Sequence, residues 1–170
     1  MIMNHPELVT DLEKLDILGK LREDENYRFK NFLKGQNSRK VDLMVHRINT
    51  EIAPNIDCTA CGNCCKHLSP NLTKEDLKNL TGALQIPVEE VIEKYTETME
   101  HELSLKHLPC SFLQDNKCGI YCHRPEACAS FPHLHQTGFV SRLRRVIDNY
   151  SICPIIFNVL ERLKQEMDFE

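Results

Sequence analysis

The sequence has 170 residues, 41% of them hydrophobic, and a formal net charge of −4 from 21 basic and 25 acidic side chains. This length is typical of a single domain, and the hydrophobic content excludes wholesale disorder. The acidic balance and the lack of a basic cluster argue against nucleic acid and anionic membranes as partners.

The N-terminal ten residues show neither the basic region nor the apolar core of a secretory signal, and no run of about 18 apolar residues predicts a membrane span. We therefore expect a cytoplasmic protein with no membrane partner. Its nine cysteines are the unusual feature. In a reducing compartment, clustered cysteines act as metal ligands or redox groups rather than as disulfides, and their odd number also argues against full pairing.

The first part of the chain, residues 1–53, has no cysteine and carries helical patterns. An apolar stripe follows Pro6, and a weaker one lies between residues 23 and 34. Ser38 is the expected N-cap of a third helix, in which apolar residues repeat at helical spacing from 41 to 52. The simplest interpretation of these stripes is core packing, with a surface for a partner helix as the alternative.

The next segment, residues 54–70, is a loop by composition, because it is rich in Pro, Asn, Gly and Cys. Thr73 and Asp76 have the spacing of a capping box and predict a short helix over residues 74–80. Pro87 suits the first position of another helix.

Short elements are expected in the remainder of the chain. Two strands, 109–113 and 117–121, form a hairpin, and Pro125 opens a single helical turn. Residues 139–149 are compatible with a strand or a helix. Pro154 suits the first position of a closing helix.

These elements predict a mainly α fold with small β (α+β) in one domain, residues 1–170. Within it we expect a helical N-terminal segment (1–53), a cysteine-cluster metal-binding region with short strands (54–135) and a C-terminal segment that closes with a helix (136–170).

Four cysteines lie close together in the sequence: Cys58, Cys61 and Cys64 are spaced by two residues, and Cys65 is adjacent. Thiolates at this spacing let a tight loop wrap around one metal centre, and Gly62 allows the backbone to turn. Adjacent side chains generally point apart, so the last two cysteines do not easily serve one tetrahedral ion. They would ligate two centres or one polynuclear cluster, unless one of them is idle.

The other cysteines are Cys110, Cys118, Cys122, Cys128 and Cys153. Eight of the nine would suffice for two four-thiolate sites, but the count does not assign ligands. The alternative for each is a small buried hydrophobic side chain, and Cys122 is the weakest ligand candidate. Among the histidines, His67 follows the first cluster closely, and His133 and His135 form a His-x-His pair; each is a ligand or an ordinary surface histidine.

Together these motifs resemble the CxxCxxCC cysteine-cluster family, also called the YkgJ-type or zinc- or iron-chelating domain. The resemblance covers about residues 58–132 and the Cys153-Pro154 pair, and leaves residues 1–53 outside. The motifs that carry it are the cysteine run 58–65, Pro109-Cys110-Ser111-Phe112-Leu113, Cys118-Gly119-Ile120-Tyr121, Arg124-Pro125-Glu126-Ala127-Cys128 and Phe131-Pro132.

The resemblance implies metal binding, with zinc or an iron–sulfur cluster as the cofactor and metal ions as partners. It places the family's pattern cysteines on Cys58, Cys61, Cys64, Cys65, Cys110, Cys118, Cys128 and Cys153. The sequence departs from the family at Ala129, where an arginine is common, and at His133, where an apolar residue is usual. Flagellin lysine methylases carry a related domain, so an iron–sulfur-dependent, methyltransferase-like enzyme is the alternative function.

Zinc and an iron–sulfur centre both remain open at this point. Closed four-thiolate zinc sites contribute to folding, whereas a polynuclear cluster accommodates the adjacent Cys64 and Cys65 more naturally. Arg124 makes either a structural contact or a contact with an anion near the cluster. No catalytic residue and no protein partner emerges from the sequence.

Overall fold

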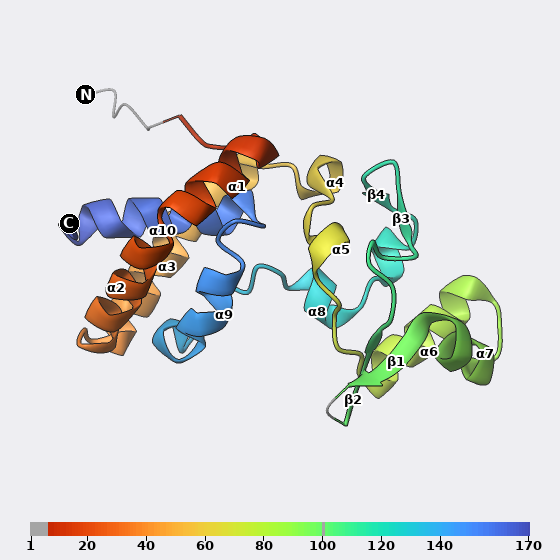
Figure 1. The fold of residues 1–170 in the computed structure, drawn as a ribbon. Helices are drawn as coiled ribbons and strands as arrows, with labels where there is room; N and C mark the ends of the chain where they lie inside the picture. Colours follow the sequence, from red (N-terminus) through yellow and green to blue (C-terminus); the bar gives the residue numbers. More distant parts are fainter. Residues whose placement is uncertain (1–6, 100) are drawn as a thin grey trace. The chain divides into compact units, whose positions relative to one another are not determined.

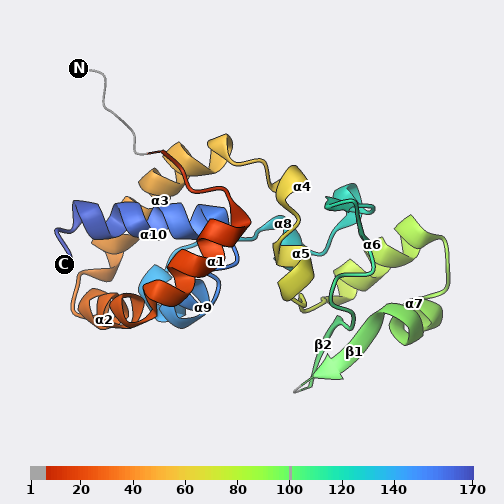
Figure 2. The ribbon, with the colours of Figure 1, turned by 45° about the horizontal axis from the view of Figure 1, so that its top comes forward.

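The computed structural model describes residues 7–99 and 101–170, and this part of the chain is mainly helical, with two small two-stranded sheets (Figures 1 and 2). The predicted fold class is therefore confirmed. The chain divides into two compact units: unit 1 comprises residues 1–56 and 132–170, and unit 2 comprises residues 57–131. The expectation that the chain is one domain stays a prediction.

Unit 1 is a helical bundle. No helix in the described residues has the length and apolar character needed to cross a membrane. The helices of unit 1 are α1 (Leu12–Leu21), α2 (Glu23–Lys34), α3 (Ser38–Ile52), η1 (Ala53–Asn55), η3 (Phe139–Arg142), α9 (Leu143–Asp148) and α10 (Pro154–Glu166), with η marking 3₁₀ helices.

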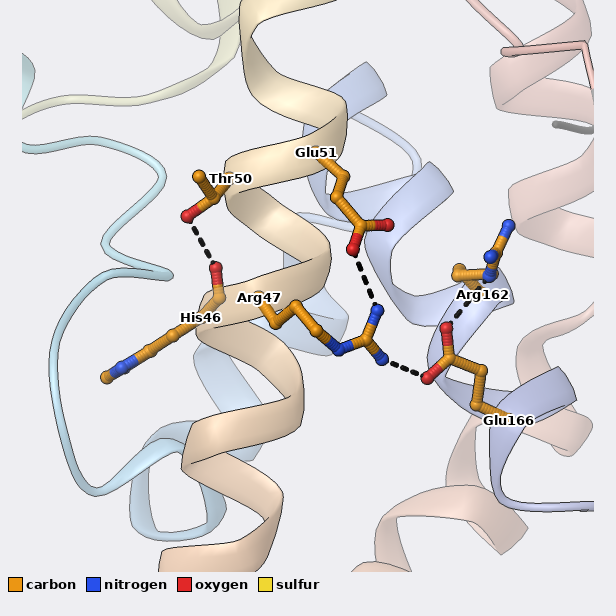
Figure 3. A network of polar contacts seen from close by, with 6 residues as sticks. All are labelled: His46, Arg47, Thr50, Glu51, Arg162 and Glu166. Carbon is orange, nitrogen blue, oxygen red and sulfur yellow. Dashed lines mark hydrogen bonds and ion pairs between the residues drawn. The ribbon is translucent and has the colours of Figure 1, made fainter. Parts of the chain in front are cut away.

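Helices α3 and α10 lie side by side and form the centre of unit 1 (Figures 1 and 2). The buried apolar residues of α3 recur at helical spacing, whereas α10 is buried on all sides from Pro154 to Leu160. Figure 3 shows Arg47 of α3 reaching across to Glu166 of α10, while its other nitrogen binds Glu51 at 2.9 Å. The buried apolar residues of the two helices include Val41, Val45 and Ile48 of α3 and Ile156, Leu160 and Leu163 of α10.

Two buried polar side chains fix irregular backbone in unit 1. Asp42 of α3 accepts hydrogen bonds from the backbone N–H groups of Gly138 and Phe139, both at 2.8 Å, and so holds the start of η3. Asn158 of α10 accepts from the N–H of Val9 at 3.0 Å and donates to its carbonyl at 2.9 Å. The segment before α1 is thereby tied to α10.

The helices of unit 1 agree closely with the sequence patterns. Helix α2 spans the predicted residues 23–34, and Pro154 opens α10 at its first turn. The sequence was compatible with a strand or a helix at residues 139–149, and these residues are mainly helical. One cap differs, because the side chain of Asn37, rather than Ser38, accepts the hydrogen bond from the N–H of Lys40.

The apolar stripe after Pro6 begins before the first helix does. Helix α1 starts at Leu12, because Asp11 accepts a hydrogen bond from the N–H of Lys14 at 2.7 Å and so caps the helix there. Leu8 and Val9 precede the helix, and residues 1–6 lie outside the described residues.

Unit 2 combines short helices with two hairpins around a small core. In β1–β2, Thr96 pairs with Leu105, and in β3–β4, Leu113 pairs with Cys118. The core consists of Leu80, Val91, Leu105 and Phe112. The elements are α4 (Cys58–Cys61), α5 (Cys64–His67), α6 (Lys74–Leu84), α7 (Val88–Tyr95), β1 (Thr96–Met99), β2 (Glu102–Leu105), β3 (Leu113–Gln114), β4 (Lys117–Cys118), η2 (Tyr121–His123) and α8 (Glu126–Ala129).

Several predictions for unit 2 are confirmed and others are corrected. The capping box of Thr73 and Asp76 is present, although α6 continues to Leu84 rather than ending near residue 80. The segment 54–70 is not simply a loop, because it contains the helical turns α4 and α5. The second hairpin has shorter strands than predicted, and β1–β2 was not predicted at all.

Candidate metal centre

The cysteine run at residues 58–65 folds as two helical turns around a sharp bend. Asp57 accepts from the N–H of Thr59 at 2.9 Å and caps α4. Gly62 then takes a left-handed conformation with φ +58°. A Cβ added there would lie 2.7 Å from the carbonyl oxygen of Asn116, in the turn of the β3–β4 hairpin. Only glycine fits both the conformation and this close approach, so the bend seats the run against the hairpin.

Backbone hydrogen bonds bring two cysteine-bearing segments to this run. The N–H of Cys110 donates to the carbonyl of Cys65 at 2.8 Å, which joins the loop before β3 to α5. The carbonyl of Cys110 in turn accepts from the N–H of Leu113 at 2.9 Å. Leu113 pairs with Cys118 across the second hairpin. The backbone itself thus brings together cysteines of the run, of the loop before β3 and of β4.

The fourth segment, α8 with Cys128, is held by Asp76. This carboxylate is only 4% exposed. It accepts from the N–H and the hydroxyl of Thr73, at 2.8 and 2.7 Å, and from the N–H of Glu126 at 2.8 Å. Burial alone would raise the pKa of Asp76, but these hydrogen bonds outweigh it and hold the pKa below its ordinary value. One side chain therefore caps α6 and anchors the first turn of α8.

Four thiols from these segments influence one another's pKa. Burial is the main reason that the pKa of Cys128 rises to about 12, and the charges of the other three raise it further. Burial also raises the pKa of Cys110 and of Cys118, and each of these two lies near Cys65. We call this set the four-thiol group; its members are Cys65, Cys110, Cys118 and Cys128.

The other cysteines of the run lie beside this group. A hydrogen bond between the adjacent thiols of Cys64 and Cys65 lowers the pKa of Cys65. Rotation about the Cα–Cβ bond allows this despite the divergence of neighbouring Cβ atoms on a helix. Burial raises the pKa of Cys58, with a further contribution from the nearby Cys61.

The remaining candidates are placed differently. Cys122 is exposed on η2. Cys153 belongs to unit 1, where it is 5% exposed at the start of α10. His67 and His135 are exposed, and His133 is half-buried with a left-handed backbone. The assignment of any of them to a metal stays a prediction.

The donor set fits a thiophilic metal ion, because thiolates are the ligands that zinc and iron–sulfur centres prefer in proteins. No disulfide joins any of the nine cysteines. Within residues 7–99 and 101–170, no group of three or more His, Cys, Asp or Glu side chains lies close enough together to hold a metal ion. The four-thiol group therefore contains suitable donor atoms, but its sulfurs are not arranged as the ligands of a metal ion.

Comparison with known proteins agrees with this chemistry. Residues 57–154, more than half of the chain, match the CxxCxxCC family, described as a "putative zinc- or iron-chelating domain". The chain belongs to this family. It is also 37% identical over 84 residues to an uncharacterized protein of Methanocaldococcus jannaschii. That match covers 46% of this chain and 45% of the relative, so the chain spans about half the length of the curated relative. No solved structure matches the chain.

Two residues of the site have roles that the sequence did not indicate. The Thr-x-x-Asp spacing identified Asp76 as a cap, but nothing in the pattern linked it to α8, which lies 50 residues further on. Asn116 stood out only as a turn residue, whereas its carbonyl limits what can replace Gly62. Both roles depend on contacts between distant segments, which spacing does not encode.

Proposed function

We propose that this protein binds a zinc or iron centre in unit 2 through Cys65, Cys110, Cys118 and Cys128. The observation that carries the proposal is the joining of these segments by the backbone: the N–H of Cys110 donates to the carbonyl of Cys65, and β3 pairs with β4. Charges on the four thiols also raise pKa values within the group. Four like-charged thiolates in a half-buried site repel one another, and a bound cation removes this penalty.

The surroundings of the group favour a stable centre. Cys110 and Cys118 pack against the hydrophobic core of unit 2, which limits access of water to their sulfurs. The proposal requires the four sulfurs to draw together to metal–sulfur distances of about 2.3 Å. Because they sit on short elements joined by turns, side-chain rotation and small backbone shifts supply this movement.

The rest of the cysteine run belongs to the same proposal as a second set of donors. Cys58 and Cys61 lie near each other on α4, and Cys64 contacts the four-thiol group through Cys65. A polynuclear centre would use this contact directly, whereas a mononuclear zinc site would leave Cys64 as a neighbouring thiol. Cys153 stays a ligand prediction from the sequence.

The test is the metal content of protein purified without oxygen, measured by elemental analysis together with a visible spectrum. Cys128→Ser removes one member of the four-thiol group, and we expect it to lose most of the bound metal. Cys122→Ser is the matched control, because this exposed cysteine lies on the neighbouring η2, and we expect its metal content to equal that of the wild type. Full metal retention by Cys128→Ser would refute the proposed ligand set.

The same samples identify the metal. A colourless protein with zinc indicates a closed thiolate site with a structural or metal-handling role. A brown protein with iron and acid-labile sulfide, bleached by reduction, indicates an iron–sulfur centre. Protein that contains neither metal, even after reconstitution with both, would contradict the proposal as a whole.

A further inference from the structure

Unit 1 contains a cavity that is separate from the cysteines of unit 2. Its volume is about 1080 Å³, near the upper limit for pockets that bind small organic molecules. It therefore suits an organic molecule rather than a single ion. Helices α1, α3 and α10 and the segment before α1 line it, and Figure 2 shows α10 between the other two helices. All the lining residues belong to unit 1.

The walls of the cavity are largely apolar. Phe157 of α10 and Ile52 of α3 are buried in the fold, and Leu18 of α1 is half-buried. Leu8 and Val9, in the extended segment before α1, continue the apolar lining. A hydrocarbon chain placed along these walls would be removed from water, and the resulting gain in binding free energy grows with the area covered.

The polar part of the lining includes a guanidinium with unused donors. The side chain of Arg162, on α10, is only 24% exposed, and its Nε donates to Glu166 at 2.9 Å (Figure 3). Its two terminal nitrogens have no hydrogen-bond or ion-pair partner among the residues that the structure describes. The parallel N–H groups of these nitrogens match the two oxygens of a carboxylate.

The charged residues that line the cavity include more cations than carboxylates. They are Lys14, Arg22, Arg47 and Arg162, with Glu7, Glu51 and Glu161. Arg22 and Arg47 each form an ion pair with a carboxylate of this set. Lys14 and Arg162 then remain with one carboxylate, Glu7, and the nearby Glu166 binds Arg162 only at Nε. The lining can therefore accept one further negative charge.

We propose that the cavity of unit 1 binds an amphipathic carboxylate of the medium-chain fatty acid class. The terminal nitrogens of Arg162 bind the carboxylate, and the hydrocarbon chain lies along Phe157, Ile52 and Leu18. This inference goes beyond the proposed function, because no residue of the proposed metal site takes part in it.

The experiment is isothermal titration calorimetry of the full chain with dodecanoate below its micelle-forming concentration. We expect decanoate to bind about tenfold more weakly than dodecanoate, because it buries two methylene groups fewer. Dodecanol has the same chain without the charge, and we also expect it to bind about tenfold more weakly. Equal binding of the alcohol and the acid would contradict the role given to Arg162.

Two variants separate binding by the guanidinium from its structural ion pair. Arg162→Gln removes the guanidinium, and we expect the affinity for dodecanoate to fall by about tenfold or more. Glu166→Gln is the matched control, because it removes the same ion pair but keeps the guanidinium; we expect its affinity to equal or exceed that of the wild type. Equal losses in the two variants would show that the ion pair only maintains the cavity, and the inference would be wrong.

Two further outcomes would overturn the inference. One is no binding of dodecanoate up to about 1 mM. The other is a concentration-dependent dimer that Leu18→Gln disperses, which would identify the cavity as an interface between copies of the chain. The metal content of the same samples is measured in parallel and should equal that of the wild type in every variant, so failure here is distinguishable from failure of the proposed metal site.

Discussion

Replacing Asp76 with alanine tests whether one buried carboxylate holds two helices of unit 2 together. The substitution removes acceptors for the N–H and hydroxyl of Thr73, at 2.8 and 2.7 Å, and for the N–H of Glu126 at 2.8 Å. Loss of the helix cap costs about 1 kcal/mol. A buried backbone donor that loses a charged acceptor costs about 2 kcal/mol more. We therefore expect the free energy of unfolding to fall by about 3 kcal/mol.

The effect should depend on pH in a defined direction. Because the pKa of Asp76 in the folded protein lies below its ordinary value, its contribution to stability is complete above the unfolded pKa of about 3.9. It is lost as the pH falls through the lower folded value. The difference in stability between the wild type and Asp76→Ala should therefore be constant near neutral pH and shrink in acid.

The assay is urea unfolding of the full chain with a metal chelator present, so that bound metal does not contribute. Glu75→Gln is the matched control, because this exposed neighbour on α6 makes a surface ion pair at 3.4 Å with Lys78; its effect should stay within about 0.5 kcal/mol. A loss below about 1 kcal/mol for Asp76→Ala would show that the two helices do not depend on this carboxylate. A difference that stayed constant from neutral pH to about pH 2 would contradict the electrostatic argument.

Three further substitutions test local features. Asp42→Ala removes two backbone hydrogen bonds of 2.8 Å from a side chain that is 9% exposed, and should cost about 2–3 kcal/mol in urea unfolding; a change under about 0.5 kcal/mol would contradict this. Gly62→Ala places a Cβ 2.7 Å from the carbonyl oxygen of Asn116 at φ +58°, and should cost about 2 kcal/mol and reduce metal content; unchanged values of both would refute the steric argument. Asn158→Ala releases Val9 from α10 and should speed amide hydrogen exchange there by about tenfold, whereas unchanged protection would mean that other contacts hold the segment.

Regular helices were predictable because their apolar residues repeat over several turns. The stripe from residue 41 to 52 and the proline-led closing helix correspond to α3 and α10 almost residue for residue. The turns α4 and α5 were not predictable in this way, since four residues are too few to show a period. The hairpin β1–β2 was missed for a similar reason, because each of its strands is only four residues long.

The candidate metal centre was likewise predictable only in part. The spacing of the cysteines and their resemblance to a family identified metal-binding candidates, and membership of that family is confirmed. The spacing of the cysteines could not predict which of them lie together in the fold, because this depends on tertiary contacts. The hydrogen bond between Cys110 and Cys65 and the contact of Asp76 with α8 set that grouping, and both join segments more than 40 residues apart in the chain.

Unit 2 is one continuous stretch, whereas unit 1 is made of two stretches separated by it. On the ribosome, residues 57–131 are therefore all synthesised before α10 exists to pack against α3. At roughly 5–20 residues per second, the 39 residues from 132 to 170 take about 2–8 seconds to make. During that interval unit 2 has been synthesised in full, whereas the C-terminal part of unit 1 has not. Metal loading during translation would therefore precede closure of the helical bundle.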